Sequence, residues 1–199
     1  MIATDSREHL QVERAGNGVV TIRLDNPERG NAMSAAMTAS WAALMTELRH
    51  DRSVRAVVVT GAGSAFSSGG ETVWTGAPPD DFGERSAPFY RAWLAIRDLE
   101  VPTIAAINGP AGGAGLCLAL ATDLRYAAEG ATLSLLTGRV VTGAEAVGLG
   151  LVNRAFPAAD LAAEVAAIAD SVAACAPIPT RRQGLPAARE KRATTFAGR

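Results

Sequence analysis

Two strand-like segments that each run into a glycine-rich loop constrain this chain more than any other feature. Residues 103–108 are β-branched and apolar, and they lead into a turn with glycines at positions 109, 112, 113 and 115 and then an apolar stretch. Residues 54–60 have the same character and lead into the segment GAGSAFSSGGE. Runs of this kind are typical of buried strands, and glycines let a ligand approach the backbone closely. The sequence therefore predicts two loops with backbone N–H groups near a ligand.

The spacing of these glycines excludes the common nucleotide-binding loops. It fits neither GxGxxG before an acidic ribose ligand nor GxxxxGK[ST]. A helix that starts after such a turn has unpaired N–H groups and partial positive charge, which suits a developing negative charge. The alternative is a tight turn needed only for packing.

Hydrophobic periodicity predicts helices that alternate with the strands. Helices are expected over residues 34–50, 86–99, 142–149 and 160–174, and strands over 10–12, 18–24, 54–60, 103–108 and 124–127. Helices between successive strands favour an α/β architecture with mainly parallel strands. A chain of 199 residues can bury one substantial core, so one domain is expected.

Composition excludes several partner classes. Apolar residues make up 48%, charged residues 20%, and the formal net charge is −1, which gives no reason to expect a nucleic acid or membrane partner. No apolar run suits a signal peptide or a membrane span, so a cytoplasmic location is expected. Cys117 and Cys175 are predicted to be buried free thiols rather than a disulfide, and no Cys/His cluster suggests a metal.

Four stretches, taken together and in order, resemble the enoyl-CoA hydratase/isomerase (crotonase) family. They are LDNPERGNAMS at 24–34, VRAVVVTGAGSAFSSGGE at 54–71, VPTIAAINGPAGGAGLCLALATDLRYAAE at 101–129 and LLTGRVVTGAEAVGLGLVNRAFP at 135–157. The resemblance implies a crotonase-like spiral of ββα units over residues 1–176, followed by a weakly ordered tail at 177–199. It also implies a homotrimer or hexamer, and an acyl-CoA substrate whose coenzyme A is part of the substrate rather than a separate cofactor.

The resemblance also implies a set of site residues. The backbone N–H groups of Ser68 and Ala114 would form an oxyanion hole, in which one such donor is typically worth about 10²–10³ in rate. Loop residues of the same motifs would hold the substrate and its coenzyme A. These are Arg29, Asn31, Ala32, Gly69, Gly70, Gly113 and Cys117.

Departures from the family pattern concern the acid and base groups. Hydration of an enoyl thioester by the familiar route needs two carboxylates. Cys117 stands where the family's hydratases have the first, and the segment that would carry the second is missing between Ser134 and Leu135. The helical region toward the C-terminus is also short, and Val73 replaces a lysine that often contacts phosphate.

Glu71 remains as a candidate acid or base, with a loop carboxylate satisfied by local N–H groups as the alternative. Three functions stay open. The first is an acyl-CoA enzyme of non-hydratase chemistry, such as an isomerase, a decarboxylase, or a hydrolase of thioester or C–C bonds. The second is a catalytically silent acyl-CoA-binding subunit. The third is an incomplete fragment of an ordinary hydratase/isomerase.

Overall fold

The computed structural model describes residues 3–71, 79–134 and 138–175, and its largest element is a seven-stranded sheet. The strands lie in the order β1-β2-β3-β4-β5-β7-β10, antiparallel from β1 to β3 and parallel from β3 onward. Their bounds are β1 Ala3–Arg7, β2 Leu10–Arg14, β3 Val19–Leu24, β4 Ala56–Gly61, β5 Thr103–Ile107, β7 Leu124–Ala128 and β10 Arg154–Phe156. The predicted α/β architecture with mainly parallel strands is confirmed.

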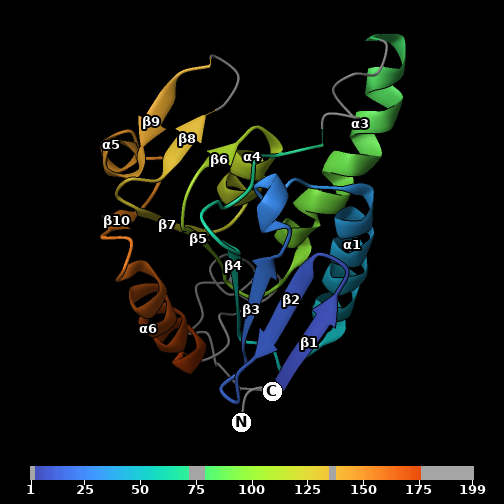
Figure 1. The fold of residues 1–199 in the computed structure, drawn as a ribbon. Helices are drawn as coiled ribbons and strands as arrows, with labels where there is room; N and C mark the ends of the chain where they lie inside the picture. The colour runs from blue at the N-terminus through green and yellow to red at the C-terminus, as the bar shows by residue number, and fades with distance from the viewer. Residues whose placement is uncertain (1–2, 72–78, 135–137, 176–199) are drawn as a thin grey trace, which may run out of the picture.

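One face of this sheet is covered by α1 (Ala35–His50) (Figure 1). Helix α3 (Pro79–Trp93) packs against α1 and continues into the short helix η2 (Leu94–Asp98). Ser34 caps α1 by accepting a hydrogen bond from the N–H of Met37, as its position before an apolar-periodic run predicts. Trp41 of α1 stacks on Trp93 of α3 with 4.8 Å between the ring centroids. Large aromatic side chains therefore fill the core between these helices and the sheet.

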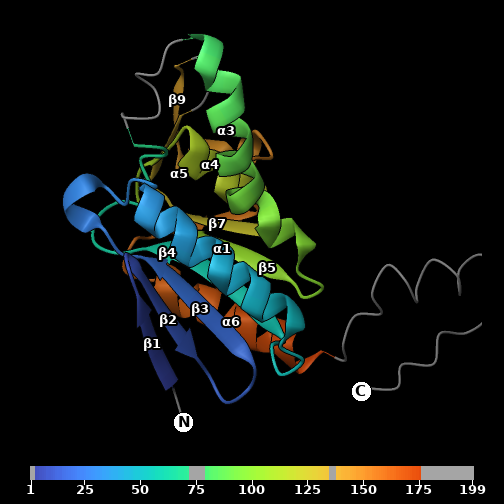
Figure 2. The ribbon, with the colours of Figure 1, turned by 90° about the vertical axis from the view of Figure 1, so that its right-hand side faces the viewer.

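The opposite face of the sheet carries α6 (Leu161–Ala174), as the two ribbon views show (Figures 1 and 2). Leu161 and Val165 are buried, and Ile168 and Val172 pack against the core while partly exposed. The apolar stripe of α6 is thus covered by the chain's own sheet. It gives no independent reason to expect a second copy, and the trimer or hexamer stays a prediction.

A smaller sheet lies beside the main one and follows the central glycine turn. It has the order β6-β8-β9, with β6 at Ala111–Gly112, β8 at Thr132–Ser134 and β9 at Val140–Thr142. Helix α4 (Ala114–Leu120) starts directly after β6, and α5 (Gly143–Gly148) follows β9. Thr142 and Glu145 form a capping box at the start of α5, which explains why that short helix begins there.

Three features differ from the sequence-based expectations. Strand β1 was not expected, because its polar, exposed residues lack the apolar alternation of a core strand. Helix α3 lies earlier than predicted, at Pro79–Trp93, with Pro88 inside it. Cys175 is exposed at the end of α6 rather than buried, although both cysteines are free as predicted. The tail from residue 177, Val73, and the junction at Leu135 lie outside the described residues.

Candidate active site

The two glycine-rich loops meet side by side at the ends of β4 and β5. The N–H of Ser67 donates to the carbonyl of Pro110 at 3.2 Å, and the N–H of Gly112 donates to the carbonyl of Ser67 at 2.9 Å. This short parallel bridge joins the segment after β4 to the segment that leads into α4. Backbone atoms of residues about 45 positions apart in sequence are therefore held in one place by hydrogen bonds.

The contact between the loops leaves no room for side chains at Gly69. Its φ of +96° lies in the region that favours glycine. A Cβ at Gly69 would lie 2.8 Å from the carbonyl oxygen of Gly112 and 3.0 Å from the amide nitrogen of Ala114. Gly69 therefore lets the first loop lie directly against the start of α4.

Two backbone N–H groups at this junction are left without a partner among the described residues. One belongs to Ala114, the first residue of α4, and the other to Gly70. A buried or half-buried backbone N–H is nearly always bonded in a native protein. Two such groups on neighbouring loops are what an oxygen acceptor of a ligand would need. Gly113, predicted to hold substrate, is the residue before α4, and its own N–H donates to the carbonyl of Ser134 at 3.1 Å.

Ser68, the other predicted oxyanion donor, is already engaged. Its N–H donates to the carbonyl of Gly30 at 2.8 Å, and its hydroxyl donates to the carbonyl of Arg29 at 3.3 Å. Its amide therefore ties the first loop to residues 29–30, so it is not available as an oxyanion donor in this structure, which corrects that expectation. The amide of Gly70, two residues further on, is the open one. Sequence spacing alone does not reveal this, because it does not show which N–H groups along the loop find internal partners.

The side chain of Asn31 holds neighbouring loop segments together. Its side chain is fully buried, donates to the carbonyls of Ala62 and Ala65 at 2.9 and 2.8 Å, and accepts from the N–H of Asn26 at 2.9 Å. Ala32 is buried next to it. All polar atoms of the Asn31 side chain therefore hold protein loops together, and the predicted role of Asn31 in substrate binding stays a prediction.

The charged residues of the two motifs pair with each other. Arg29 and Glu71 form an ion pair of 2.8 Å, in which the arginine side chain is 69% exposed. Glu71 is thus satisfied by a guanidinium rather than by local N–H groups. Asp123, after α4, accepts from both the N–H and the hydroxyl of Thr103 at 2.8 Å. Asp123 therefore holds the start of β5 through its backbone and its side chain.

The groups of α3 and α4 nearest to this junction in sequence and packing are neutral. The ring of Phe89 in α3 lies next to Gly70. A Cβ atom added at Gly70 would be 3.5 Å from this ring. Cys117 lies one turn into α4, and burial raises the pKa of its thiol. Burial also raises the pKa of Tyr90, and the neighbouring Cys117 adds to that effect. Because both groups are neutral near pH 7, the arrangement offers hydrogen-bond donors rather than a thiolate nucleophile.

Among the described residues, no group of three or more His, Cys, Asp or Glu side chains is placed to hold a metal ion. No helix in the described part of the chain has both the length and the apolar character needed to cross a membrane.

Known proteins share both the sequence pattern and the fold. A family model described as enoyl-CoA hydratase/isomerase matches residues 14–135. A putative enoyl-CoA hydratase of Thermus thermophilus is 34% identical over 205 residues, covering 86% of this chain and 80% of that protein. The 4-chlorobenzoyl coenzyme A dehalogenase-2 of an Arthrobacter species is 33% identical over 219 residues, covering 92% of this chain and 78% of that protein.

Among solved structures, an enoyl-CoA hydratase from Bacillus anthracis superimposes with a TM-score of 0.82 at 25% identity, covering 96% of this chain and 100% of that chain. The alignment with the Arthrobacter protein spans 219 residues and so exceeds the 199 residues of this chain. It must therefore place gaps in this chain, as a missing internal segment requires. The family model, the relatives and the fold together show that the chain belongs to the enoyl-CoA hydratase/isomerase (crotonase) family.

Proposed function

We propose that this protein binds an acyl-CoA thioester and stabilises negative charge on its carbonyl oxygen with the N–H groups of Ala114 and Gly70. The observation that carries the proposal is the pair of unpartnered amides on two loops that Gly69 brings into contact. Preorganised donors of this kind act where charge develops in the transition state. The names of the relatives support a coenzyme A conjugate as the ligand, since they refer to enoyl-CoA and to 4-chlorobenzoyl coenzyme A.

The reaction is proposed to be something other than the hydration of an enoyl thioester. Water addition needs carboxylates that orient water and transfer a proton. Glu71 is paired with Arg29 and Asp123 with Thr103, and Cys117 is a neutral thiol. Decarboxylation fits best, because its main requirement is to stabilise the enolate that forms when carbon dioxide leaves. Isomerisation, or hydrolysis of a thioester or C–C bond, would also use this stabilisation but would need a further group to move a proton.

A catalytically silent acyl-CoA-binding subunit is the second candidate. It is favoured by the same observation, that the carboxylates nearest to the motifs are bonded to other groups of the protein. The two candidates predict the same binding and differ in turnover. In both, coenzyme A belongs to the ligand and no separate cofactor is needed.

Replacement of Ala114 by proline tests the proposal directly. Proline removes the N–H but is tolerated at the first position of a helix, where that N–H has no partner within the helix, so α4 should persist. Ala114→Gly is the matched control, because it keeps the N–H. On any acyl-CoA that the wild type converts, we expect Ala114→Pro to lower kcat about 10²–10³-fold and Ala114→Gly to change it little.

Wild-type hydration of crotonyl-CoA should lie near the detection limit, because losing each acid or base group typically costs about 10²–10⁴ in rate. Robust hydration would contradict the non-hydratase reaction. Equal turnover by Ala114→Pro and Ala114→Gly would contradict the oxyanion role of this amide. A thermal shift with acyl-CoA but no turnover over a panel of thioesters would identify the silent binder, and the absence of any shift would remove the acyl-CoA proposal.

A further inference from the structure

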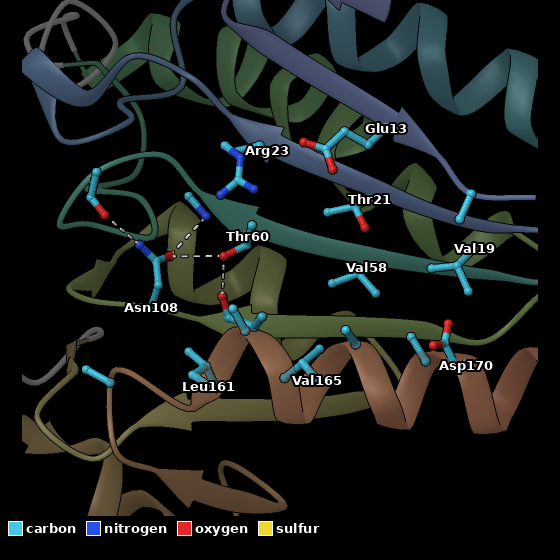
Figure 3. Close-up of a pocket in the computed structure, with 18 residues that line it drawn as sticks. Glu13, Val19, Thr21, Arg23, Val58, Thr60, Asn108, Leu161, Val165 and Asp170 are labelled. Atoms are coloured by element: carbon cyan, nitrogen blue, oxygen red, sulfur yellow. Dashed lines mark hydrogen bonds between the residues drawn. The ribbon is translucent and has the colours of Figure 1, made fainter. Parts of the chain in front are cut away.

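A cavity lies on the face of the sheet that carries α6, between that helix and strands β2 to β5, and holds about 440 Å³ (Figure 3). The open amides of the active site lie instead beside Phe89 of α3, which packs against α1. Small apolar side chains form most of the cavity wall along α6 and the facing strands. They include Leu161, Ala162, Val165 and Ala166 on the helix and Val19 and Val58 on the sheet.

Most polar groups of this cavity are already satisfied within the protein. Thr60 donates to the carbonyl of Ala106 at 2.9 Å and also lies 3.3 Å from the side-chain oxygen of Asn108. Asn108 in turn donates to the carbonyl of Gly63 at 3.0 Å. At the other end, Asp170 accepts a hydrogen bond of 2.7 Å from Asn17, which ties α6 to the turn between β2 and β3. These groups shape the cavity but have little capacity left for a ligand.

Three half-buried side chains on one wall have no partner among the described residues: Arg23 and Thr21 on β3, and Glu13 on β2. Figure 3 shows the Arg23 guanidinium and the Glu13 carboxylate projecting into the cavity, with Arg23 close to Thr60. Arg23 and Glu13 do not form an ion pair, although they lie on adjacent strands. A charged group that is half removed from water without a partner is costly, so the guanidinium is suited to receive a charge from a ligand.

The chemistry of this wall indicates which ligand fits. A guanidinium presents a rigid fork that matches a carboxylate in a bidentate geometry. The apolar walls extend from Arg23 along α6, over Leu161 and Val165 toward Asp170. A molecule with an anionic head and an apolar body would satisfy both parts. We propose that this cavity is a binding site for a small monocarboxylic acid of medium chain length, with the carboxylate on Arg23 and the chain along α6. This site is separate from the proposed acyl-CoA site and does not depend on it.

Titration calorimetry with octanoate tests the proposal, and octanamide is the uncharged probe of matching shape. We expect octanoate to bind and octanamide to bind at least about tenfold more weakly, since a hydrogen bond to a charged group is typically worth more than one decade in affinity. Arg23→Gln should weaken octanoate binding by a similar factor. Glu13→Gln should tighten it, because it removes a like charge from the same wall. No heat with octanoate, or equal binding of acid and amide, would overturn the proposal.

A steric pair of variants locates the ligand even if Arg23→Gln fails to fold. Ala166 and Ala167 are both exposed neighbours on α6, and Ala166 lines the cavity. Ala166→Phe should fill the cavity and abolish octanoate binding, whereas Ala167→Phe should leave it unchanged. Octanoate should also bind Ala114→Pro with the wild-type affinity, which distinguishes this site from the acyl-CoA site. Equal affinity of both phenylalanine variants would place the ligand elsewhere and overturn the proposal.

Discussion

The two ends of the glycine-rich loops differ in how their polar groups are used. At the inner end, next to β4 and β5, the side chains of Asn31 and Asn108 bond mainly to loop carbonyls and amides, and Asn108 also accepts from the hydroxyl of Thr60. At the outer end, the N–H groups of Gly70 and Ala114 have no partner in the described part of the chain. The conspicuous polar side chains of the motifs therefore build the scaffold, and the groups left for a ligand belong to the backbone.

A backbone donor places few demands on the side chain at its own position. A backbone N–H does not depend on the identity of its own side chain, so an alanine at 114 can donate as well as a glycine would. The N–H of Ala114 does depend on how closely the two loops pack. Gly69 lets the first loop approach the start of α4. Gly115 lets α4 pack on Ser67, because a Cβ at Gly115 would lie 2.4 Å from the Ser67 carbonyl oxygen.

The largest loss of stability should come from removing the Asn31 side chain, whose polar atoms are all hydrogen-bonded within the protein. Asn31→Ala would leave the half-buried carbonyl of Ala62 and the half-buried N–H of Asn26 without partners and would place alanine at a φ of +55°. Because each unsatisfied buried group costs about 1–3 kcal/mol, we expect the free energy of unfolding to fall by about 3 kcal/mol in urea denaturation. Thr46→Ala, which removes an exposed hydrogen bond to the carbonyl of Ala42, is the control and should cost under about 1 kcal/mol. Equal losses would mean that Asn31 is not the scaffold residue we infer.

Sequence reasoning recovered the layout of the fold far better than the roles of individual site residues. Helix α1 with its Ser34 cap, strands β4, β5 and β7, and helix α6 follow from periodicity and capping, because burial and local hydrogen bonding act over a few neighbouring residues. The roles of Ser68 and Asn31 could not be read in this way. Each depends on a partner more than 30 positions away, Gly30 for the Ser68 amide and Ala62 or Ala65 for the Asn31 side chain.

The reactivity of the Cys117 thiol tests the outer end of the loops, where the N–H groups of Gly70 and Ala114 have no partner in the described part of the chain. A cysteine near a helix start often has a lowered pKa, but here burial raises the pKa of Cys117. The thiolate fraction at pH 7 should therefore be below that of an ordinary cysteine, whose pKa is about 8.5. We expect iodoacetamide to modify exposed Cys175 first, and the rate at Cys117 to keep rising with pH above the ordinary thiol range. Mass mapping of the two sites checks this, and fast labelling of Cys117 at pH 7 would mean that the outer end holds a reactive thiolate after all.

The smallest effect on stability is expected from the ion pair that joins the two motifs. Arg29 is 69% exposed, so solvent screens its interaction with Glu71, and exposed pairs typically contribute about 0.2–1 kcal/mol. Glu71→Gln and Arg29→Gln should therefore both lower the free energy of unfolding by less than about 1 kcal/mol.

Their effects on turnover separate the two possible roles of Glu71. If it only pairs with Arg29, the two variants should convert an acyl-CoA at equal rates. If it transfers a proton, Glu71→Gln alone should lose about 10²–10⁴ in kcat, because glutamine keeps the size of the side chain but cannot accept the proton. The structure favours equal rates, since the carboxylate is bonded to Arg29 at 2.8 Å. A selective loss in Glu71→Gln would show that the outer end holds a working base as well as two open amides.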